Sequence, residues 1–323
     1  MSVKYEIQKT IFQNVVDQMS QKHKDANNIP DGRKKAKKMG VADRYIYSYG
    51  TAKKVMSVMN HVAKFSGVTN INQLRKKHTD AYMKDSINRG LDKDTLVTRR
   101  FAIRKFEKCM IYTGKKSKHA DSFAPTVELP KENRINPRGR YTQEEYETII
   151  SELKDDFSPE IVKAVEIQNA LGLRINEALN ITTNDINLAE IIISNNIAKG
   201  GKDRKVPVFN KEHPLIISIL ANHDYDDKDK VVDIGERRIQ QAIREVCLEN
   251  GIKPRGSHGF RGKFANERLK YYCQKHGVKY DLKHLRDDPE ASLKKEEKGV
   301  LMMVSKDLGH ERISVIRNYY LHR

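Results

Sequence analysis

The chain has 323 residues, which is long enough for two domains of ordinary size. Its 61 lysines and arginines outnumber its 43 aspartates and glutamates, so the formal net charge is +18. A chain this basic predicts a polyanionic partner, and a merely soluble basic surface is the alternative. No apolar run approaches membrane-spanning length and no signal peptide opens the chain, so we favour nucleic acid over acidic lipid and expect a cytoplasmic protein.

The cysteine and histidine spacings predict no metal site. Cys109, Cys247 and Cys273 are odd in number, and none has a partner at the spacing of a metal-binding or redox motif. The histidines also lack the paired spacing of a zinc site. We therefore expect reduced thiols in the core and no structural metal.

The N-terminal part of the chain carries helical apolar patterns and many basic side chains. A one-sided pattern in residues 1–25 predicts a helix, and the basic loop 31–38 is either a solvated linker or a phosphate contact. Further helices are expected from Thr51 to Gly67, from Thr79 to Gly90 and from Leu96 to Gly114. The last of these interleaves basic residues with its apolar positions, among them Arg99, Arg100 and Arg104.

Residues 119–140 separate this helical part from a second domain. They contain three prolines and few periodic apolar positions, which is typical of a linker. Thr142 and Glu145 then fit a capping box, so a helix should begin there. We expect a helix and basic loop over residues 1–40, a helical DNA-binding bundle over 41–118, and the second domain over 141–323.

A Leu-Gly-Leu-Arg motif lies in residues 171–179, which read LGLRINEAL. Arg174 and Glu177 are spaced so that the carboxylate can reach back one helical turn to the guanidinium. On its own, this pair is better interpreted as a surface ion pair, which contributes little.

A β-hairpin is predicted after this motif. The β-branched run 191–193 forms one strand, and a glycine pair interrupts the pattern before Val206 begins the other. This places Lys199 and Lys202 at the tip, with Arg204 shortly after them.

Two more pairs of polar residues follow. A helix is expected from 234 to 250, and His258 and Arg261 come at the start of the next helix, where a spacing of three puts them on one face. His310 is expected at the start of the last helix, and Tyr319 follows nine residues later. Each pair alone is common in ordinary helices, and a tyrosine in a terminal helix is usually a packing residue.

Taken in order, these four motifs resemble the active site of the tyrosine recombinases, the phage integrase family. The similarity covers residues 140–323 and, more loosely, 41–115. It implies a mainly α fold with a small antiparallel β-hairpin in the catalytic domain, the two domains forming a C-shaped clamp around DNA. It also implies double-stranded recombination sites as partners, a homo-tetramer on two duplexes, an accessory factor that bends DNA or sets direction, and association with the nucleoid.

The resemblance implies cleavage without a metal or a high-energy cofactor. Tyr319 would be the nucleophile that forms a 3′-phosphotyrosine. It is preferred to Tyr320 because its nine-residue offset from His310 fits the family. Arg174 and Arg261 would clamp the phosphate oxygens with planar, permanently charged guanidiniums.

The same resemblance assigns the proton transfers. His258 would accept or share the tyrosine proton, His310 would hydrogen-bond the phosphate, and Lys199 would protonate the leaving 5′-oxygen, with Lys202 as the runner-up. Glu177 would orient Arg174 and His258. Other contacts with DNA are expected from Lys202, Arg204, Arg99, Arg100 and Arg104.

One segment departs from compact members of the family. The gap from Arg261 to His310 is 49 residues, roughly twice that of compact members, and its extra part, residues 278–299, is heavily charged. We interpret this part as a surface elaboration, with a protein or DNA contact as the alternative.

These features predict a site-specific DNA recombinase, the integrase of a mobile element. A type IB topoisomerase-like enzyme shares the residue set but relaxes supercoils as a monomer, and a Xer-like dimer resolvase is another candidate. A DNA-binding protein that has lost catalysis is disfavoured, because every expected catalytic residue type is present.

Overall fold

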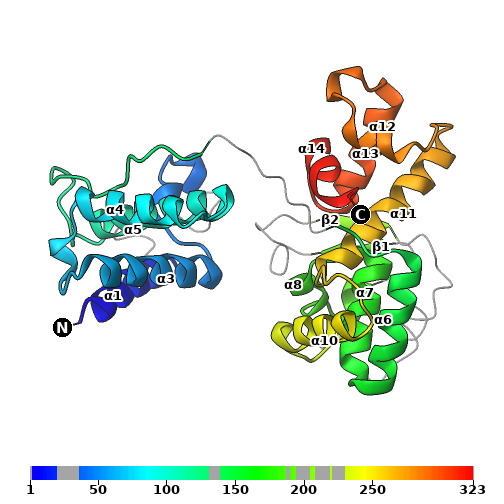
Figure 1. Ribbon diagram of the computed structural model, residues 1–323, viewed down its shortest axis with the longest axis horizontal. Coiled ribbons are helices and arrows are strands. Elements are labelled where there is room, and N and C mark those ends of the chain that lie inside the picture. Colours follow the sequence, from blue (N-terminus) through cyan, green and yellow to red (C-terminus); the bar gives the residue numbers. More distant parts are fainter. Residues whose placement is uncertain are drawn as a thin grey trace. The chain divides into compact units, whose positions relative to one another are not determined.

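The computed structural model describes residues 2–19, 36–130, 139–186, 190–193, 204–207, 219 and 230–322. The chain divides into two compact units, Met1–Arg134 and Ile135–Arg323, each with its own hydrophobic core (Figure 1). Both units are mainly helical, and the described residues contain one two-stranded antiparallel sheet. The expected fold class, mainly α with a small antiparallel hairpin, is therefore confirmed.

The first unit is a helical bundle. Its described elements are α1 (Val3–Met19), the 3₁₀ turn η2 (Ala42–Arg44), α3 (Tyr49–Ser66), the 3₁₀ turn η3 (Ile71–Gln73), α4 (Lys76–Asn88) and α5 (Lys93–Tyr112). Their apolar faces meet around fully buried residues such as Met83 and Phe106. The sequence sets the ends of α3 locally: the Ser48 side chain accepts from the Thr51 amide, and Gly67 ends the helix in the left-handed conformation, at φ 68°.

The second unit contains the polar motifs. Its described helical elements are α6 (Gln143–Asp156), α7 (Pro159–Leu171), α8 (Ile175–Ala178), the 3₁₀ turn η4 (Thr183–Asp185), α10 (Glu236–Glu249), α11 (His258–Lys275), α12 (Leu282–Asp287), the 3₁₀ turn η5 (Glu290–Ser292), α13 (Lys295–Asp307), α14 (Ile313–Val315) and the π-helical turn η6 (Ile316–Tyr320). The predicted capping box is confirmed, because the Glu145 amide donates to the Thr142 hydroxyl at 3.1 Å and the Thr142 amide donates to the Glu145 carboxylate at 2.8 Å.

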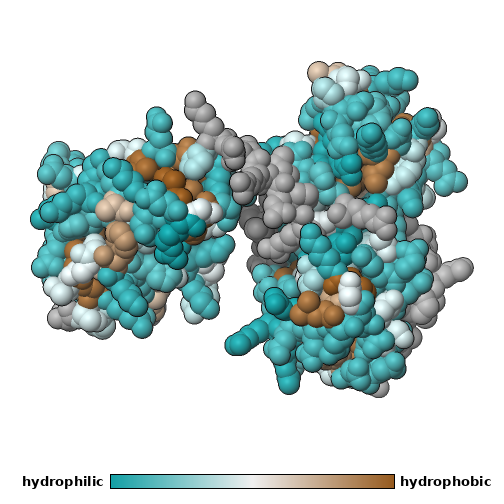
Figure 2. All heavy atoms as spheres, in the orientation of Figure 1, coloured by the Kyte–Doolittle hydropathy of each residue, from teal (hydrophilic) through white to brown (hydrophobic). Residues whose placement is uncertain are grey.

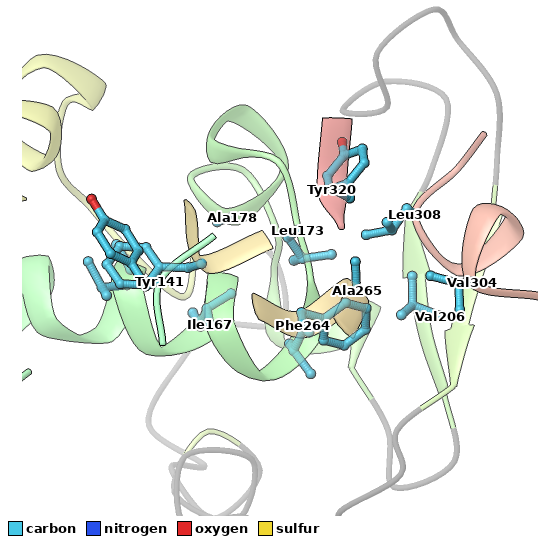
Figure 3. Close-up of a cluster of buried hydrophobic side chains, with 14 of the residues drawn as sticks. Tyr141, Ile167, Leu173, Ala178, Val206, Phe264, Ala265, Val304, Leu308 and Tyr320 are labelled. Carbon is cyan, nitrogen blue, oxygen red and sulfur yellow. The ribbon is translucent and has the colours of Figure 1, made fainter. Parts of the chain in front are cut away.

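Helix α11 occupies the centre of this unit. It contacts α7, α13 and η6, and its apolar residues Phe264, Ala265 and Leu269 lie in the core. Figure 3 shows part of this buried cluster, in which Leu173 and Tyr320 join residues of α11. The first turn of α11, which contains His258 and Arg261, therefore lies next to the C-terminal turn η6.

The sheet is the predicted hairpin. Strand β1 (Glu190–Ile193) pairs with β2 (Arg204–Pro207), so that Ile193 lies opposite Arg204 and Ile191 opposite Val206. Val206 is fully buried. The tip lysines, Lys199 and Lys202, lie outside the described residues.

The charged segment 278–299 was expected to be a surface elaboration, and this is only half right. Lys283 and Asp287 are exposed, but Leu285 is fully buried and Leu293 is 3% exposed. Both leucines belong to the core of the second unit, where burial removes their apolar surface from water, and α12, which carries Leu285, contacts the C-terminal turn η6.

The surface is mainly hydrophilic, as expected from the high content of charged residues. Figure 2 shows mainly hydrophilic residues on the visible face of each unit, with smaller hydrophobic patches between them. Among the described helices, none is both long and apolar enough to cross a membrane.

Candidate active site

The polar motifs of the second unit meet at the first turn of α11. Each comes from the end of an element: Arg174 and Glu177 from α8 and its N-cap, Arg204 from β2, His258 and Arg261 from α11, His310 from the loop after α13, and Tyr320 from η6. We call this set the cluster. Side chains at the ends of several elements can converge without disturbing the core between them.

Arg261 is the centre of the cluster. Its side chain is fully buried, and its Nε donates to the hydroxyl of Tyr320 at 3.0 Å. Its two terminal nitrogens donate to the carbonyls of Gly172 and Leu308. Burial lowers the pKa of Arg261. A desolvated guanidinium needs hydrogen-bond acceptors, and the Tyr320 hydroxyl and these two carbonyls supply one for each of its three nitrogens.

The carbonyl of Leu308 holds both clamp arginines. It accepts from Arg261 and also from the terminal nitrogen of Arg174 at 3.2 Å. Gly172 must be a glycine for its carbonyl to serve Arg261, because its φ is +60° and a Cβ there would lie 2.3 Å from the ring of Phe264. The Leu-Gly pairs before Arg174 and His310 thus supply backbone carbonyls that bind the arginines, and glycines that adopt positive φ.

Glu177 neutralises part of the positive charge. Its side chain is 1% exposed and accepts from Arg174 Nη1 at 2.8 Å and from the two terminal nitrogens of Arg204 at 2.7 and 2.5 Å. Burial raises the pKa of Glu177, but the hydrogen bonds and charge of Arg204, together with the charge of Arg261, lower it to about 2. The predicted reach of Glu177 to Arg174 is confirmed, and the simpler interpretation as a surface ion pair is wrong.

Arg204 lies in the cluster rather than on the surface. We expected it to contact DNA, but its side chain is 9% exposed and forms a bidentate pair with Glu177. The methylene chain also packs on Gly309, where a Cβ would come within 2.9 Å of Arg204 Cδ. The buried carboxylate explains this placement, because an unpaired Glu177 would be costly to desolvate.

His310 reaches the hydroxyl of Tyr320, and His258 lies beside the Tyr320 ring. The Nε2 of His310 lies 3.2 Å from that hydroxyl, and the ring of His258 lies 5.1 Å from the Tyr320 ring between centroids. Burial and the charges of Arg261, Arg174 and Arg204 lower the pKa of His310 to about 3, so its imidazole is neutral at neutral pH. His310 follows α13 in a loop, and the expectation that it begins a helix is wrong because Gly309, at φ +68°, interrupts the chain direction there.

The tyrosine in the cluster is Tyr320, not Tyr319. Tyr320 is 3% exposed and hydrogen-bonded to Arg261, whereas Tyr319 is 46% exposed. The cause is the π-helical turn η6, in which the Leu321 amide donates to the Ile316 carbonyl five residues back, at 3.3 Å. A π-turn holds one residue more than an α-helical turn. The tenth residue after His310 therefore takes the place that we expected for the ninth.

Comparisons with known proteins point to one family for the second unit. Residues 140–287 match the family model described as phage integrase family. Over 221 residues, 64% of this chain and 71% of the relative, the sequence is 26% identical to tyrosine recombinase XerC of Proteus mirabilis. The second unit therefore contains a phage integrase family domain, and these matches support the tyrosine recombinase family for the chain.

Solved tyrosine recombinases share the fold of this one. A structure of the Tn1549 transposon integrase with a circular intermediate DNA has a TM-score of 0.57 and 14% identity, covering 88% of this chain and 93% of that one. A lambda integrase dimer bound to a COC′ core site has a TM-score of 0.58 and 14% identity, covering 88% and 75%. The family match and the curated relatives support a DNA recombinase or integrase enzyme.

The arginines of α5 are in different local environments in the first unit of this recombinase. Arg99 donates to Ser86 at 2.6 Å and its guanidinium lies 5.1 Å from the centre of the Tyr82 ring. Arg104 is exposed and reaches the carbonyl of Pro125 at 3.4 Å, while Arg100 is half-buried. A contact between these residues and DNA stays a prediction.

Proposed function

We propose that this recombinase cleaves and rejoins DNA through a 3′-phosphotyrosine formed by Tyr320. One observation carries the proposal: the hydroxyl of Tyr320 lies 3.0 Å from Arg261 Nε and 3.2 Å from His310 Nε2, in a cluster that also holds Arg174. A nucleophile placed between a fixed cation and a neutral base is suited to attack a phosphodiester. Tyr319, the residue that the spacing favoured, is not proposed as the nucleophile.

The hydrogen-bond pattern suggests where the tyrosine proton goes. Arg261 can only donate, so the Tyr320 oxygen accepts there and its own proton is free to point to His310. In the DNA-free site burial and the guanidiniums lower the pKa of His310 to about 3, so its imidazole is neutral, and the negative charge of a bound phosphate would raise that pKa and allow His310 to accept the proton. We therefore propose that His310 accepts the tyrosine proton. His258, which lies beside the Tyr320 ring, would donate a hydrogen bond to the phosphate. These two roles are the reverse of those expected from the resemblance.

The reaction balances without a high-energy cofactor. As the Tyr320 proton passes to His310, the tyrosine oxygen forms a bond to phosphorus and the bond from phosphorus to the 5′-oxygen breaks. Lys199, at the tip of the hairpin, would give its proton to that leaving oxygen, with Lys202 as the runner-up. Rejoining is the same step reversed, so the phosphodiester energy is kept in the phosphotyrosine bond.

The charges of the cluster suit the transition state. In the described residues it contains three guanidiniums, from Arg174, Arg204 and Arg261, against the single carboxylate of Glu177. The surplus is two positive charges, which favours the extra negative charge that builds on the non-bridging oxygens. Arg174 and Arg261 would contact the phosphate, and Arg204 would hold Glu177, which orients Arg174. No step of this scheme calls for a metal.

The biological role is proposed from the relatives. Solved structures of similar fold include the Tn1549 transposon integrase with a circular intermediate DNA and a lambda integrase tetramer bound to a Holliday junction. We propose that this chain is the integrase of a mobile element, acts as a homo-tetramer on two duplexes, closes a C-shaped clamp on each, and uses an accessory DNA-bending or directionality factor at the nucleoid. A Xer-like resolvase role is the alternative, since XerC is among the relatives.

Strand exchange tests this function. A supercoiled plasmid carrying the joined ends of the DNA that flanks the coding region, incubated with a second plasmid carrying the uninterrupted target, should yield recombinant junctions, also in excess chelator. Relaxation of the plasmids without junctions would indicate a topoisomerase instead. Loss of all cleavage in chelator, restored by magnesium, would contradict the mechanism.

A further inference from the structure

The charged segment 278–299 packs against the turn that carries Tyr320. Helix α12 contacts η6, and Leu285 of α12 lies in the same buried cluster as Ile316 and Leu321, which frame that turn. All three side chains are fully buried. The extra segment therefore forms one side of the packing around the proposed nucleophile.

One buried side chain joins the two elements. Arg317 of η6 is 7% exposed, and its Nε donates to the carbonyl of Leu285 at 2.8 Å. Its Nη2 donates to the carbonyl of Arg286 at 3.0 Å and to that of Asp288. These carbonyls end α12, where backbone acceptors have no partner within the helix and the helix dipole favours a cation. Arg317 thus supplies the C-cap of α12 from a residue three positions before Tyr320.

Helix α12 is also joined to the first turn of α13, which lies within the same segment. The ring of His284 lies 2.8 Å from Asp288 Oδ2 through Nδ1 and 3.1 Å from Glu297 Oε1 through Nε2. Hydrogen bonding to Asp288 and Glu297 raises the pKa of His284. Since α13 leads directly to Leu308, α12 is connected both to the tyrosine turn and to the carbonyl that anchors the two clamp arginines.

We propose that Arg317 is a positioning residue and that segment 278–299 is a brace that fixes the register of η6, so that Tyr320 rather than Tyr319 faces the cluster. Adjacent residues of a helix point about 100° apart, so a slip of one residue would exchange the two tyrosines. With Arg317 held by three carbonyls, that slip would break three hydrogen bonds. This inference rests on the proposed function, because it concerns which hydroxyl attacks.

The test compares cleavage rate with binding in the full-length chain. The substrate is a nicked duplex carrying the joined ends, which traps the phosphotyrosine in a single turnover. Arg317→Ala should slow adduct formation about 10²-fold, the effect of misplacing a reacting group by about an ångström, while the Kd for the duplex stays within about threefold. Arg317→Lys keeps the positive charge but has fewer hydrogen-bond donors, so it should reduce the rate of adduct formation less than Arg317→Ala does. His284→Gln should also reduce this rate less than Arg317→Ala does. Val246→Ala, a cavity variant in α10, is the control for lost stability and should keep the wild-type rate.

Peptide mapping of the adduct distinguishes positioning from a general structural role. In Arg317→Ala the register is no longer fixed, so part of the adduct should move to Tyr319, whereas lost stability alone would leave it on Tyr320. An unchanged cleavage rate would overturn the brace. The brace would also be overturned if the Arg317→Ala adduct were confined to Tyr320 and its cleavage rate fell no more than that of Val246→Ala.

A measurement without DNA separates this inference from the proposed function. If the wild-type chain forms no adduct, the proposed function fails. The brace is then tested alone by hydrogen exchange at the Leu321 amide, whose bond to the Ile316 carbonyl defines the π-turn. Arg317→Ala should speed this exchange by at least tenfold relative to Val246→Ala, and equal rates in the two variants would overturn it.

Discussion

At the scale of single residues, the cluster depends on keeping His310 neutral. Three guanidiniums and burial oppose its protonation and lower its pKa to about 3, against 6.5 for an ordinary histidine. The unfolded chain therefore binds a proton that the folded chain does not. Through this residue, stability should fall as the pH drops from about 6.5 towards 3, and it should be unaffected above 6.5.

The pKa of His310 should respond to charge in the cluster. NMR titration of the imidazole in the DNA-free chain should show no protonation of His310 between pH 8 and 5. Saturating inorganic phosphate, or the substitution Arg204→Met, should raise its pKa, because each offsets or removes positive charge near the ring. A His310 that titrates between pH 6 and 7 in the free chain, and is unchanged by phosphate, would refute this electrostatic account.

Some features of the site could be predicted from single residues and their spacing. The Arg174–Glu177 pair needs only one helical turn, and the spacing shows it directly. Two other features depend on distant parts of the chain. Arg204 turns inward because Glu177, 27 positions earlier, needs a second cation, and the role of Leu308 rests on a backbone carbonyl that any residue type would provide.

At the scale of elements, the π-turn η6 explains the main difference between expectation and structure. Caps, helix bounds and the hairpin pairing follow from local sequence, and the Thr142 capping box is an example. The extra residue in η6 does not, because it is stabilised by Arg317 binding to α12 and by Tyr320 binding to Arg261. Both contacts are tertiary, so counting residues from His310 along the sequence selected Tyr319, whereas the structure places Tyr320 in the cluster.

The hairpin carries the proposed general acid, and sulfur substitution can identify it. A thiolate leaves readily without a proton, so replacing the 5′-bridging oxygen of the scissile phosphate by sulfur should restore cleavage to Lys199→Ala. The same sulfur should not restore Arg174→Ala or Arg261→Ala, whose proposed contacts are with non-bridging oxygens. Single-turnover cleavage rates on the two substrates provide the measurement.

The second lysine serves as the comparison. Lys202→Ala should weaken DNA binding, and the sulfur-substituted substrate should not increase its cleavage rate. Rescue of Lys202→Ala in place of Lys199→Ala would exchange their roles, and rescue of neither would place the general acid outside the hairpin.

At the scale of the whole molecule, the two cores are separate. The core of the first unit draws on residues 3–123 and that of the second on residues 141–321, with no shared member. The net charge of +18 is large enough for phosphate contacts to dominate affinity. Folding and DNA binding should therefore be separable by truncation.

Removing residues 1–134 should leave a folded second unit that binds DNA weakly. Its helical circular dichroism and cooperative unfolding should persist, while the log–log slope of affinity against salt becomes shallower, because fewer phosphates are neutralised. An unfolded fragment would show that the cores are interdependent, and an unchanged slope would show that the first unit does not contact the duplex.

The central claim is that Tyr320 attacks the phosphate, and the most direct measurement is the identity of the residue that becomes covalently bound to DNA. A nicked duplex with the joined ends should trap an adduct in the full-length chain, and mass spectrometry of its peptides should place the phosphate on Tyr320. Tyr320→Phe should abolish this adduct, and Tyr319→Phe, which alters an exposed neighbour, should retain it at a rate within about threefold of the wild type. An adduct on Tyr319, or one that survives Tyr320→Phe and is lost in Tyr319→Phe, would contradict the account.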